Sequence, residues 1–362
     1  SEQKQYNGAE LYPGLIATNT SLGLNEIDAV RATRDYREVG NFKPNVRSII
    51  AYNAESNVVS TVLSNGVMFA QVCPQGGTIK GSSSVMKLKG WNWEDATYNT
   101  DEGICMDWPS MYKRSKEEGH KHTLVPDDKY GDKIAEIKRF FAEADAYAKR
   151  SNPLDRDLKY EAMRGVFDGS KTLYITADFI KEIREIIGFK RDLEIMKLCI
   201  VGGRDAWMCG ALLKENEISV AISRVHSLPR YAADPVDAPF TLPAKLSAAG
   251  VKFCFQMGGD METAQNRNLP FNIGTAIAYG LDYETAVRAA TLNAAEILGI
   301  AQKTGSIEVG KDANLVISQG DIFDMRTSII EDMYLQGKAL DLSNRQEELY
   351  KRYKAKYEAP IE

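Results

Sequence analysis

The histidines of this chain are its best candidates for metal chemistry, and the sequence holds three of them. His120 and His122 stand two apart in the segment GHKHTL, and such an HxH pair could bind one metal ion. The flanking residues are polar and Lys-rich, whereas a ligand pair at a barrel mouth needs apolar flanks to hold it. We therefore interpret this segment as a solvated loop. His226 follows an apolar run, so either a structural role or a place in a pocket is open to it.

Acidic, hydroxyl and aromatic residues offer further chemistry. Asp260 follows a Gly pair after an apolar run, which fits either a turn or a pocket. The segment 74–84 has the Gly and Ser density of a phosphate loop but lacks the GxxxxGK[ST] spacing, so we expect a loop at the mouth. Its serines have no base nearby, which argues against a Ser nucleophile. Trp91 and Trp93, in an expected loop over 91–108, favour packing over pocket lining.

Short apolar runs that recur between helical patterns must position these residues. Their alternation predicts a parallel sheet with crossover helices. Several runs are apolar on both faces, as expected of barrel strands that helices cover. An eighth strand is expected between Met86 and Thr172. The seven recognisable runs are Leu15 to Thr18, Val67 to Cys73, Val85 to Leu88, Leu173 to Ala177, Ile195 to Val201, Ile218 to Ser223 and Val251 to Met257.

The helical segments and the C-terminal region have clear patterns. Residues 130–150 carry apolar side chains at spacings of three and four, which predicts one buried helical stripe. A second helix begins after Asp282 as its N-cap and ends at Gly299. We expect two strands within 307–317, joined at 310–312, and a further strand and turn after them.

Composition excludes several classes of protein. The formal net charge is −5 and no basic block is dense enough for a nucleic-acid footprint. The apolar runs are far shorter than the roughly 18 residues that a membrane span needs. Five scattered cysteines, mostly in apolar segments, are expected to be free thiols. The expected partner is a small molecule or another protein, and the sequence leaves the compartment open between a bacterial cytoplasm and an exported location.

Two segments carry a family resemblance. YPGLIATNTSLGL (12–24) resembles the first barrel strand of the amidohydrolase superfamily, PG-apolar-apolar-Asp-x-His-x-His, and AATLNAAEILGIAQKTGSIEVGKDANLVI (289–317) resembles its ending. VGGRDAW and NLPFNIGTAIAYGL resemble the imidazolonepropionase-like and Xaa-Pro dipeptidase-like branch. The resemblance spans roughly residues 10–340. It implies an α/β fold, a (β/α)8 TIM barrel of the metal-dependent hydrolase type with part of a small β-sandwich.

The resemblance also implies a zinc or other divalent metal at the C-terminal mouth of the barrel. Matched residue by residue, the family's Asp-x-His-x-His falls on Ala17, Asn19 and Ser21 of this chain. Its later histidines fall on Thr176 and on Gly202 or Gly203. Asp260 matches the acid after the last strand and is the expected catalytic residue. We expect no metal cofactor, with Asn19, Ser21, Thr176, Arg204 and His226 lining a substrate pocket.

Two functions follow from this reading. The resemblance implies hydrolysis of a C–N bond in a cyclic amide or dipeptide-like substrate, with Asp260 handling the proton. Loss of the metal ligands instead predicts a degenerate homologue with weak or absent metal-dependent activity, which serves in binding or as partner of an active relative.

The expected organisation has four parts. Residues 1–13 form a strand that feeds the small β domain, 14–300 the barrel, 301–343 the C-terminal part of the β-sandwich and 344–362 a charged helical tail. Family members carry several tens of residues before the PG pair, against twelve here, so we expect a truncated or processed form with an incomplete sandwich. The strand edges within 307–317 then need a cover: the N-terminal segment, the C-terminal helix or a partner, such as a second copy.

Overall fold

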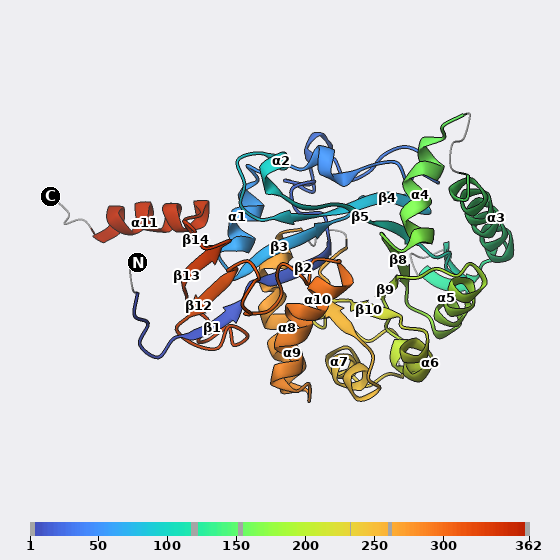
Figure 1. The fold of residues 1–362 in the computed structure, drawn as a ribbon. Coiled ribbons are helices and arrows are strands. Elements are labelled where there is room, and N and C mark those ends of the chain that lie inside the picture. Colours follow the sequence, from blue (N-terminus) through green and yellow to red (C-terminus); the bar gives the residue numbers. More distant parts are fainter. Residues whose placement is uncertain (1–3, 117–121, 151–154, 232, 260–262, 359–362) are drawn as a thin grey trace.

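One eight-stranded sheet forms the centre of the molecule. The computed structural model describes residues 4–116, 122–150, 155–231, 233–259 and 263–358. Neighbouring strands follow the order β11-β10-β9-β8-β5-β4-β3-β2, and a parallel bridge between Thr18 and Gln256 joins the two end strands. The sheet therefore closes into a barrel (Figure 1). Its strands are β2 (Leu15–Thr20), β3 (Val67–Val72), β4 (Ile79–Lys87), β5 (Thr97–Asp107), β8 (Thr172–Ala177), β9 (Leu198–Gly202), β10 (Ser219–Ile222) and β11 (Phe253–Phe255).

The expected TIM-type α/β barrel is confirmed, with one departure from a fully parallel sheet. Strand β4 runs antiparallel to both β3 and β5. Residues 73–78 alone connect β3 to β4, and a parallel neighbour needs a crossover of a dozen or more residues. The prediction of a loop over 74–84 was wrong from Ile79 onward, because these residues belong to β4.

The expected eighth strand is β5, which lies within the predicted gap. The aromatic and acidic segment 91–108 is therefore not a loop for most of its length. Asn92 accepts a hydrogen bond from the Asp95 N–H and begins a short helix, α2 (Trp93–Ala96), and β5 follows directly. Trp108, just after β5, is buried.

Helices cover the outside of the barrel (Figure 1). In α3 (Tyr130–Ala148), Ile137, Phe141 and Ala144 are buried at spacings of four and three, which confirms the predicted stripe. The other helices are α1 (Asn57–Leu63), α4 (Leu158–Asp168), α5 (Ile180–Asp192), α6 (Gly210–Glu215), α7 (Ala238–Ala248), α8 (Leu269–Ala278), α9 (Tyr283–Ala290), α10 (Leu292–Ile297) and α11 (Arg345–Glu358). Two 3₁₀ turns that matter below are η3 (Ala206–Cys209) and η4 (Ala264–Asn268). In the described residues, no helix combines the length and the apolar character that crossing a membrane requires.

The helix predicted after Asp282 is present as two helices. The Asp282 side chain caps α9 by accepting the Thr285 N–H, as predicted. The chain bends at Thr291, and α10 follows it. The Ile297 carbonyl at the end of α10 accepts hydrogen bonds from Thr172 and Tyr174 of β8. This helix therefore packs under the barrel, at the start of β8, and Gly299 follows it with a positive φ of 69°.

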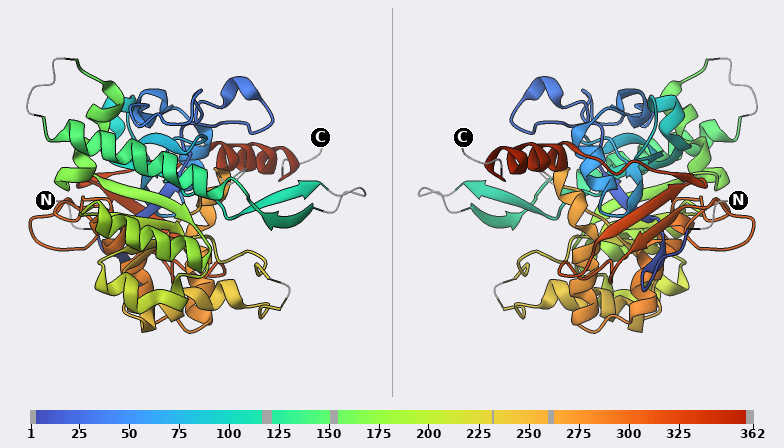
Figure 2. Two further views of the ribbon diagram at one scale, coloured as in Figure 1. Left: turned by 90° about the vertical axis from the view of Figure 1, so that its right-hand side faces the viewer. Right: turned by 90° about the vertical axis from the view of Figure 1, so that its left-hand side faces the viewer.

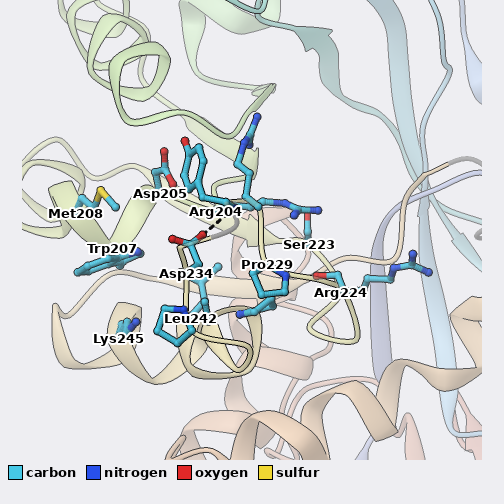
Figure 3. Close-up of a pocket in the computed structure, with 16 residues that line it drawn as sticks. Arg204, Asp205, Trp207, Met208, Ser223, Arg224, Pro229, Asp234, Leu242 and Lys245 are labelled. Carbon is cyan, nitrogen blue, oxygen red and sulfur yellow. Dashed lines mark hydrogen bonds between the residues drawn. The ribbon is translucent and has the colours of Figure 1, made fainter. Parts of the chain in front are cut away.

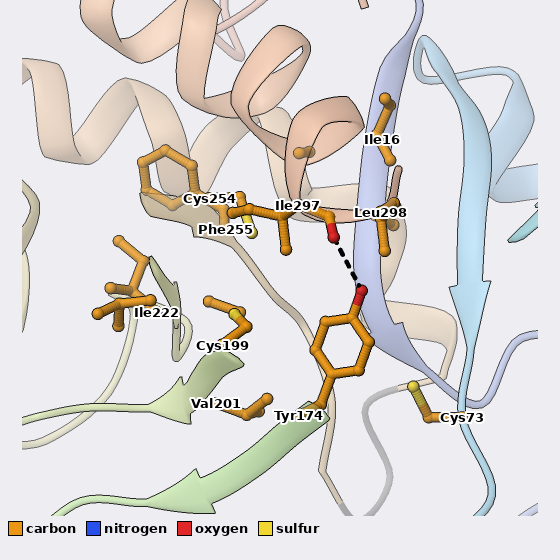
Figure 4. Packing of buried hydrophobic residues seen from close by; sticks show 14 of the residues in the cluster. Ile16, Cys73, Tyr174, Cys199, Val201, Ile222, Cys254, Phe255, Ile297 and Leu298 are labelled. Atoms are coloured by element: carbon orange, nitrogen blue, oxygen red, sulfur yellow. Dashed lines mark hydrogen bonds between the residues drawn. The ribbon is translucent and has the colours of Figure 1, made fainter. Parts of the chain in front are cut away.

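The barrel interior is apolar on this side. Figure 4 shows Ile16, Val201 and Ile222, from three strands, in one buried cluster with Ile297 and Leu298. All five cysteines are buried and free, as predicted. Cys73, Cys199 and Cys254 lie among the apolar residues of the same cluster (Figure 4). Burial raises the pKa of the Cys254 thiol to about 12, so it is a neutral, inert group at neutral pH.

A small sheet adjoins the barrel and has the order β1-β12-β13-β14. Residues 307–314 form no strand, so the prediction of two strands within 307–317 was wrong. The N-terminal strand β1 pairs antiparallel with β12, which confirms one of the expected covers for this edge. The strands are β1 (Glu10–Pro13), β12 (Leu315–Ser318), β13 (Ile330–Leu335) and β14 (Lys338–Ala339).

Two elements extend from the body of the molecule (Figure 2). One is a hairpin of β6 (Tyr112–Lys116) and β7 (His122–Pro126). The predicted solvated loop was wrong at His122, which lies in β7, while His120 is outside the described residues. The other is α11, which has no buried residue, as expected of a charged tail helix. The predicted boundaries between the four parts of the chain stay predictions.

Candidate functional site

The C-terminal ends of the parallel strands meet at one end of the barrel, here called the mouth. Because β4 is antiparallel, it presents its beginning there, and the second residue of β4 is Lys80. The Lys80 Nζ lies 2.6 Å from Oδ1 of Asp107, the last residue of β5. It also donates a hydrogen bond to Oγ1 of Thr176 on β8, at 3.3 Å. One ammonium group thus connects three neighbouring strands at the mouth.

Lys80 is a buried cation. Its side chain is 6% exposed, while that of Asp107 is 46% exposed. Burial lowers the pKa of Lys80, but the charge and the hydrogen bond of Asp107 raise it, and the net pKa is above the usual lysine value. The group therefore carries its proton at neutral pH, and the mouth holds a fixed positive charge.

Amide side chains occupy the ends of the strands on either side of the barrel seam. The Asn19 N–H donates to Gln71 Oε1 at 2.9 Å, and Asn19 Nδ2 donates to Gln256 Oε1 at 3.2 Å. Gln256 Nε2 donates in turn to Ser223 Oγ at 3.1 Å. Asn19 has a positive φ of 50°, a conformation that Asn tolerates better than most residues. These polar groups largely satisfy one another.

A buried carboxyl group continues this network into the barrel. Glu102 Oε1 accepts hydrogen bonds from Gln71 Nε2 at 2.9 Å and from Ser83 Oγ at 2.5 Å. Its Oε2 accepts the Tyr174 hydroxyl at 2.8 Å. Burial raises the pKa of Glu102 to about 7, although these three donors oppose that shift. The network therefore contains a group that titrates near neutral pH.

Three of the predicted pocket residues, Asn19, Ser21 and Thr176, lie at the mouth, each in different surroundings. Thr176 contacts Lys80, and Asn19 contacts Gln256. Ser21 Oγ lies 2.7 Å from Thr263 Oγ1, just before η4. Asp260, the predicted catalytic residue, lies outside the described residues. The catalytic and binding roles of these residues stay predictions.

His226 stands apart from the amide network. Its ring is exposed, and Nε2 lies 2.7 Å from Thr275 Oγ1 on α8. Partial burial and the nearby Arg224 lower the pKa of His226. The contact with α8 fits the structural role that the sequence left open.

Arg204 belongs to a cavity of about 100 Å³ beside the mouth. It follows β9, and its Nε lies 3.7 Å from Oδ2 of Asp178, which follows β8. Figure 3 shows how the cavity residues come together from η3, from the segment after β10 and from α7. The cavity is a second concave feature at this end of the barrel.

Sequence reasoning missed Lys80, Asp107, Gln71 and Gln256. Lys80 had a visible signal, because a lone lysine between Ile79 and a run of small residues is unusual in a segment without other charges. Lys80 was missed because the segment 74–84 was predicted to be a loop. The two glutamines carried no signal, since an uncharged polar residue in an apolar run has many possible roles.

Several of the described side chains at the mouth are neutral amide and hydroxyl groups. In the part of the chain that the structure describes, no group of three or more His, Cys, Asp or Glu side chains could hold a metal ion. The strand ends offer the Asn19 and Gln256 amides and the Thr176 hydroxyl instead. Asp107 is engaged by Lys80.

Comparisons with known proteins agree with this architecture. Residues 239–340 match the amidohydrolase family. An imidazolonepropionase of Flavobacterium psychrophilum is 30% identical over 112 residues, which are 29% of this chain and 27% of that protein. The imidazolonepropionase of Picrophilus torridus is 47% identical over 53 residues, 14% of each chain. The chain thus matches about a quarter or less of the length of these curated relatives.

Solved structures extend the likeness to almost the whole chain. An amidohydrolase from Thermotoga maritima has a TM-score of 0.78 at 23% identity, over 92% of this chain and 88% of that one. A prolidase complexed with N-methylphosphonate-L-proline has a TM-score of 0.53 at 15% identity, over 92% of this chain and 87% of that one. At these identities the structures support the fold alone. The matched segment, its relatives and the barrel fold together support the resemblance to the amidohydrolase superfamily.

Proposed function

We propose that this protein is an amidohydrolase-superfamily barrel that works without the metal of the superfamily. Its role is to bind a small molecule at the mouth, with weak or no hydrolysis through a metal-bound water. The observation that carries this proposal is the ammonium group of Lys80, held between Asp107 and Thr176 where the strand ends converge.

The charge of Lys80 opposes a divalent cation at the mouth. Two like unit charges 5 Å apart repel each other by about 3 kcal/mol at an effective dielectric constant of 20, and a divalent ion doubles that figure. Lys80 also occupies Asp107, a carboxylate that could otherwise serve as a metal ligand. The lysine thus supplies a positive charge at the mouth with no need for an ion.

The donor set supports the same proposal. Zinc in proteins is bound by thiolate, imidazole and carboxylate groups, and neutral amide or hydroxyl oxygens are weak ligands for it. Asn19, Ser21 and Thr176 stand where the superfamily pattern has histidines, and each already contacts another polar group. The described residues at the mouth therefore do not fit the metal that the superfamily implies.

Metal titration tests the proposal. Protein purified without a His tag is titrated with Zn²⁺ or Mn²⁺ in a calorimeter, and elemental analysis is carried out on the protein as purified. We expect no one-to-one binding and no stoichiometric metal. The double variant Asn19→His with Ser21→His should recover little affinity, because Thr176 and the Gly202 region still offer no ligand. About one metal ion per chain, lost in Asp260→Ala, would return this protein to the metallohydrolases, with Asp260 as the proton carrier.

A second candidate function is that of partner subunit to an active amidohydrolase. The projecting helix α11 favours it, since Tyr350, Tyr353 and Tyr357 are exposed by 63%, 52% and 77% and recur at spacings of three and four. A photo-crosslinking residue in place of Tyr353 tests this idea. Crosslinks to an amidohydrolase would support the partner role, crosslinks between copies would indicate a homo-oligomer, and a monomer without crosslinks would count against both.

A further inference from the structure

The cavity beside the mouth is the part of the molecule best prepared to hold a ligand. It lies between η3, the segment after β10 and helix α7, and has a volume of about 100 Å³ (Figure 3). Four cationic side chains and two carboxylates line it. Trp207, Leu242 and several prolines supply apolar surface. Charged groups on an apolar wall are typical of sites that orient a small ligand by one polar end.

Arg230 is fixed in place before any ligand arrives. Its guanidinium carbon lies 3.5 Å from the centre of the Phe179 ring, a close cation–π contact. Its Nη1 lies 3.1 Å from Asp178 Oδ2. A guanidinium carries five N–H donors, so an ion pair through one nitrogen leaves donors for a second acceptor. Because these two contacts already fix the Arg230 side chain, little further side-chain entropy is lost when a ligand binds to it.

Arg204 and Arg230 both lie close to the carboxylate of Asp178. Asp178 accepts Arg230 and lies 3.7 Å from Arg204, so the two guanidinium groups share one counter-charge. The Asp178 Oδ1 also accepts the Arg204 backbone N–H at 3.3 Å. Asp178 therefore balances only one of the two guanidinium charges, and the other carboxylates of the wall are Asp205 and Asp234. Arg224 does not enter this argument, because its side chain extends away from Trp207 and Asp234 (Figure 3).

The two carboxylates of the cavity wall are held by backbone groups. Asp205 Oδ2 accepts the Ile180 N–H at the start of α5, at 3.1 Å. Burial raises the pKa of Asp205, while this backbone hydrogen bond and the charge of Arg230 oppose the shift. Asp234 Oδ2 accepts the Tyr231 N–H at 3.1 Å (Figure 3). Both acids thus have partners of their own in the cavity wall.

The rest of the cavity wall limits the size and polarity of the part of the ligand that does not contact the arginines. Lys245 Nζ lies 4.6 Å from the ring centre of Trp207, which is 42% exposed. Leu242 of α7 is buried behind it. A volume of about 100 Å³ is smaller than the roughly 150 Å³ of a closed cavity that holds benzene, so it limits the enclosed part of the ligand to a single small ring or a branched chain.

We propose that this cavity binds small organic carboxylates, with the carboxylate on Arg204 and Arg230 and an apolar body against Trp207 and Leu242. The proposal goes beyond the proposed function, because the cavity lies beside the mouth and is a separate site. A guanidinium is the side chain best matched to a carboxylate, since two of its N–H groups can bind both oxygens.

Wild-type protein provides the first test, with benzoate as the probe and benzyl alcohol as its neutral counterpart. Saturation-transfer NMR at pH 7 and low salt should show transfer from protein to benzoate, and a titration gives its Kd. Benzyl alcohol should bind at least about tenfold more weakly, because it lacks the charge that the arginines recognise. Equal binding of both probes, or binding of neither, would overturn the proposal.

Matched variants locate the site. Arg230→Gln and Arg204→Gln should each raise the Kd of benzoate by about tenfold or more, since each removes a charged donor. Arg139→Gln, on the exposed face of α3, is the control and should leave the Kd unchanged. Trp207→Ala should weaken benzoate and benzyl alcohol alike, because it removes the apolar wall. Unchanged benzoate binding in both arginine variants would refute the assigned site.

These readouts do not depend on the metal titration. Benzoate binding that is lost in Arg230→Gln supports the inference whether or not the barrel holds a metal. Stoichiometric zinc would overturn the proposed function alone, while equal binding of the two probes would overturn the inference alone.

Discussion

Replacing Asp107 by alanine should destabilise the protein far more than replacing Lys80 by methionine. The two residues form one ion pair at the mouth, but their environments differ, since the lysine side chain is 6% exposed and the aspartate 46% exposed. Without Asp107, a buried ammonium group keeps only its hydrogen bond to Thr176. Without Lys80, the remaining carboxylate can turn to water.

The structure sets the expected size of this asymmetry. Removing one partner of a fully buried ion pair costs roughly 3–5 kcal/mol. Half of Asp107 is in contact with water, which weakens the pair, so we expect about 2–3 kcal/mol for Asp107→Ala. Lys80→Met removes the ion pair, but it also removes the cost of burying a charge. These effects oppose each other, so the free energy of unfolding should change by about 1 kcal/mol or less. The double variant should be more stable than Asp107→Ala.

Urea unfolding at pH 7, followed by circular dichroism, measures all four proteins of this cycle. Asp145→Ala is the matched control, because it removes the exposed i,i+4 pair with Lys149 on α3 and should cost only a few tenths of a kcal/mol. If Asp107→Ala costs no more than this control, the description of Lys80 as a buried cation that depends on its partner is refuted. A double variant no more stable than Asp107→Ala would refute it equally.

Two further predictions concern the barrel interior. The pKa of Glu102 in the folded protein is raised from 4.5 to about 7, so the folded protein holds this proton more tightly than the unfolded chain. The free energy of unfolding should therefore fall as pH rises between these two values, by at most about 1.4 kcal/mol per pH unit. Glu102→Gln should flatten this decline in urea titrations at pH 5 to 7.5, and an unchanged slope would contradict the assignment. Gly103→Ala should cost about 3 kcal/mol, because the new Cβ would lie 2.2 Å from the Tyr174 ring and 2.7 Å from the Thr172 carbonyl oxygen. Gly188→Ala in α5, with open space around it, is the control for Gly103 and should be neutral or slightly stabilising in the same unfolding assay.

The fold could be predicted from the sequence where periodicity and end signals agreed. The stripe of α3, the Asp282 cap and the apolar runs of β8 to β10 each combine a local preference with burial, and each prediction holds. Strand β4 was only partly recognised, because Gly81 and Ser82 to Ser84 have the composition of a loop. The serines are buried in the sheet because each hydroxyl has a partner: Ser82 donates to the Pro44 carbonyl, Ser83 donates to Glu102, and Ser84 accepts the Asp101 N–H.

The candidate site was less predictable for a different reason. The superfamily pattern identified the positions of Asn19, Ser21 and Thr176, but it does not include Lys80, which contacts Thr176. Lys80 reaches the mouth only because β4 is reversed, and strand direction is not written in any short segment. The pairing of Arg204 with Arg230 likewise depends on two loops after neighbouring strands that meet on Asp178.

With the reversed strand, some paired strands of the barrel are close together in the sequence and others are far apart. Strands β3, β4 and β5 are consecutive in the chain and adjacent in the sheet, so their pairing closes only short loops. The seam between β2 and β11 joins residues that are far apart in the sequence, such as Thr18 and Phe255, which are 237 positions apart. The seam can therefore form only after both ends of the barrel sequence have come together. The three-stranded meander is therefore the natural early nucleus of folding. The seam, beside Asn19 and Gln256, is where the native barrel is expected to open first, and hydrogen exchange would detect such openings at the mouth before any other part of the sheet.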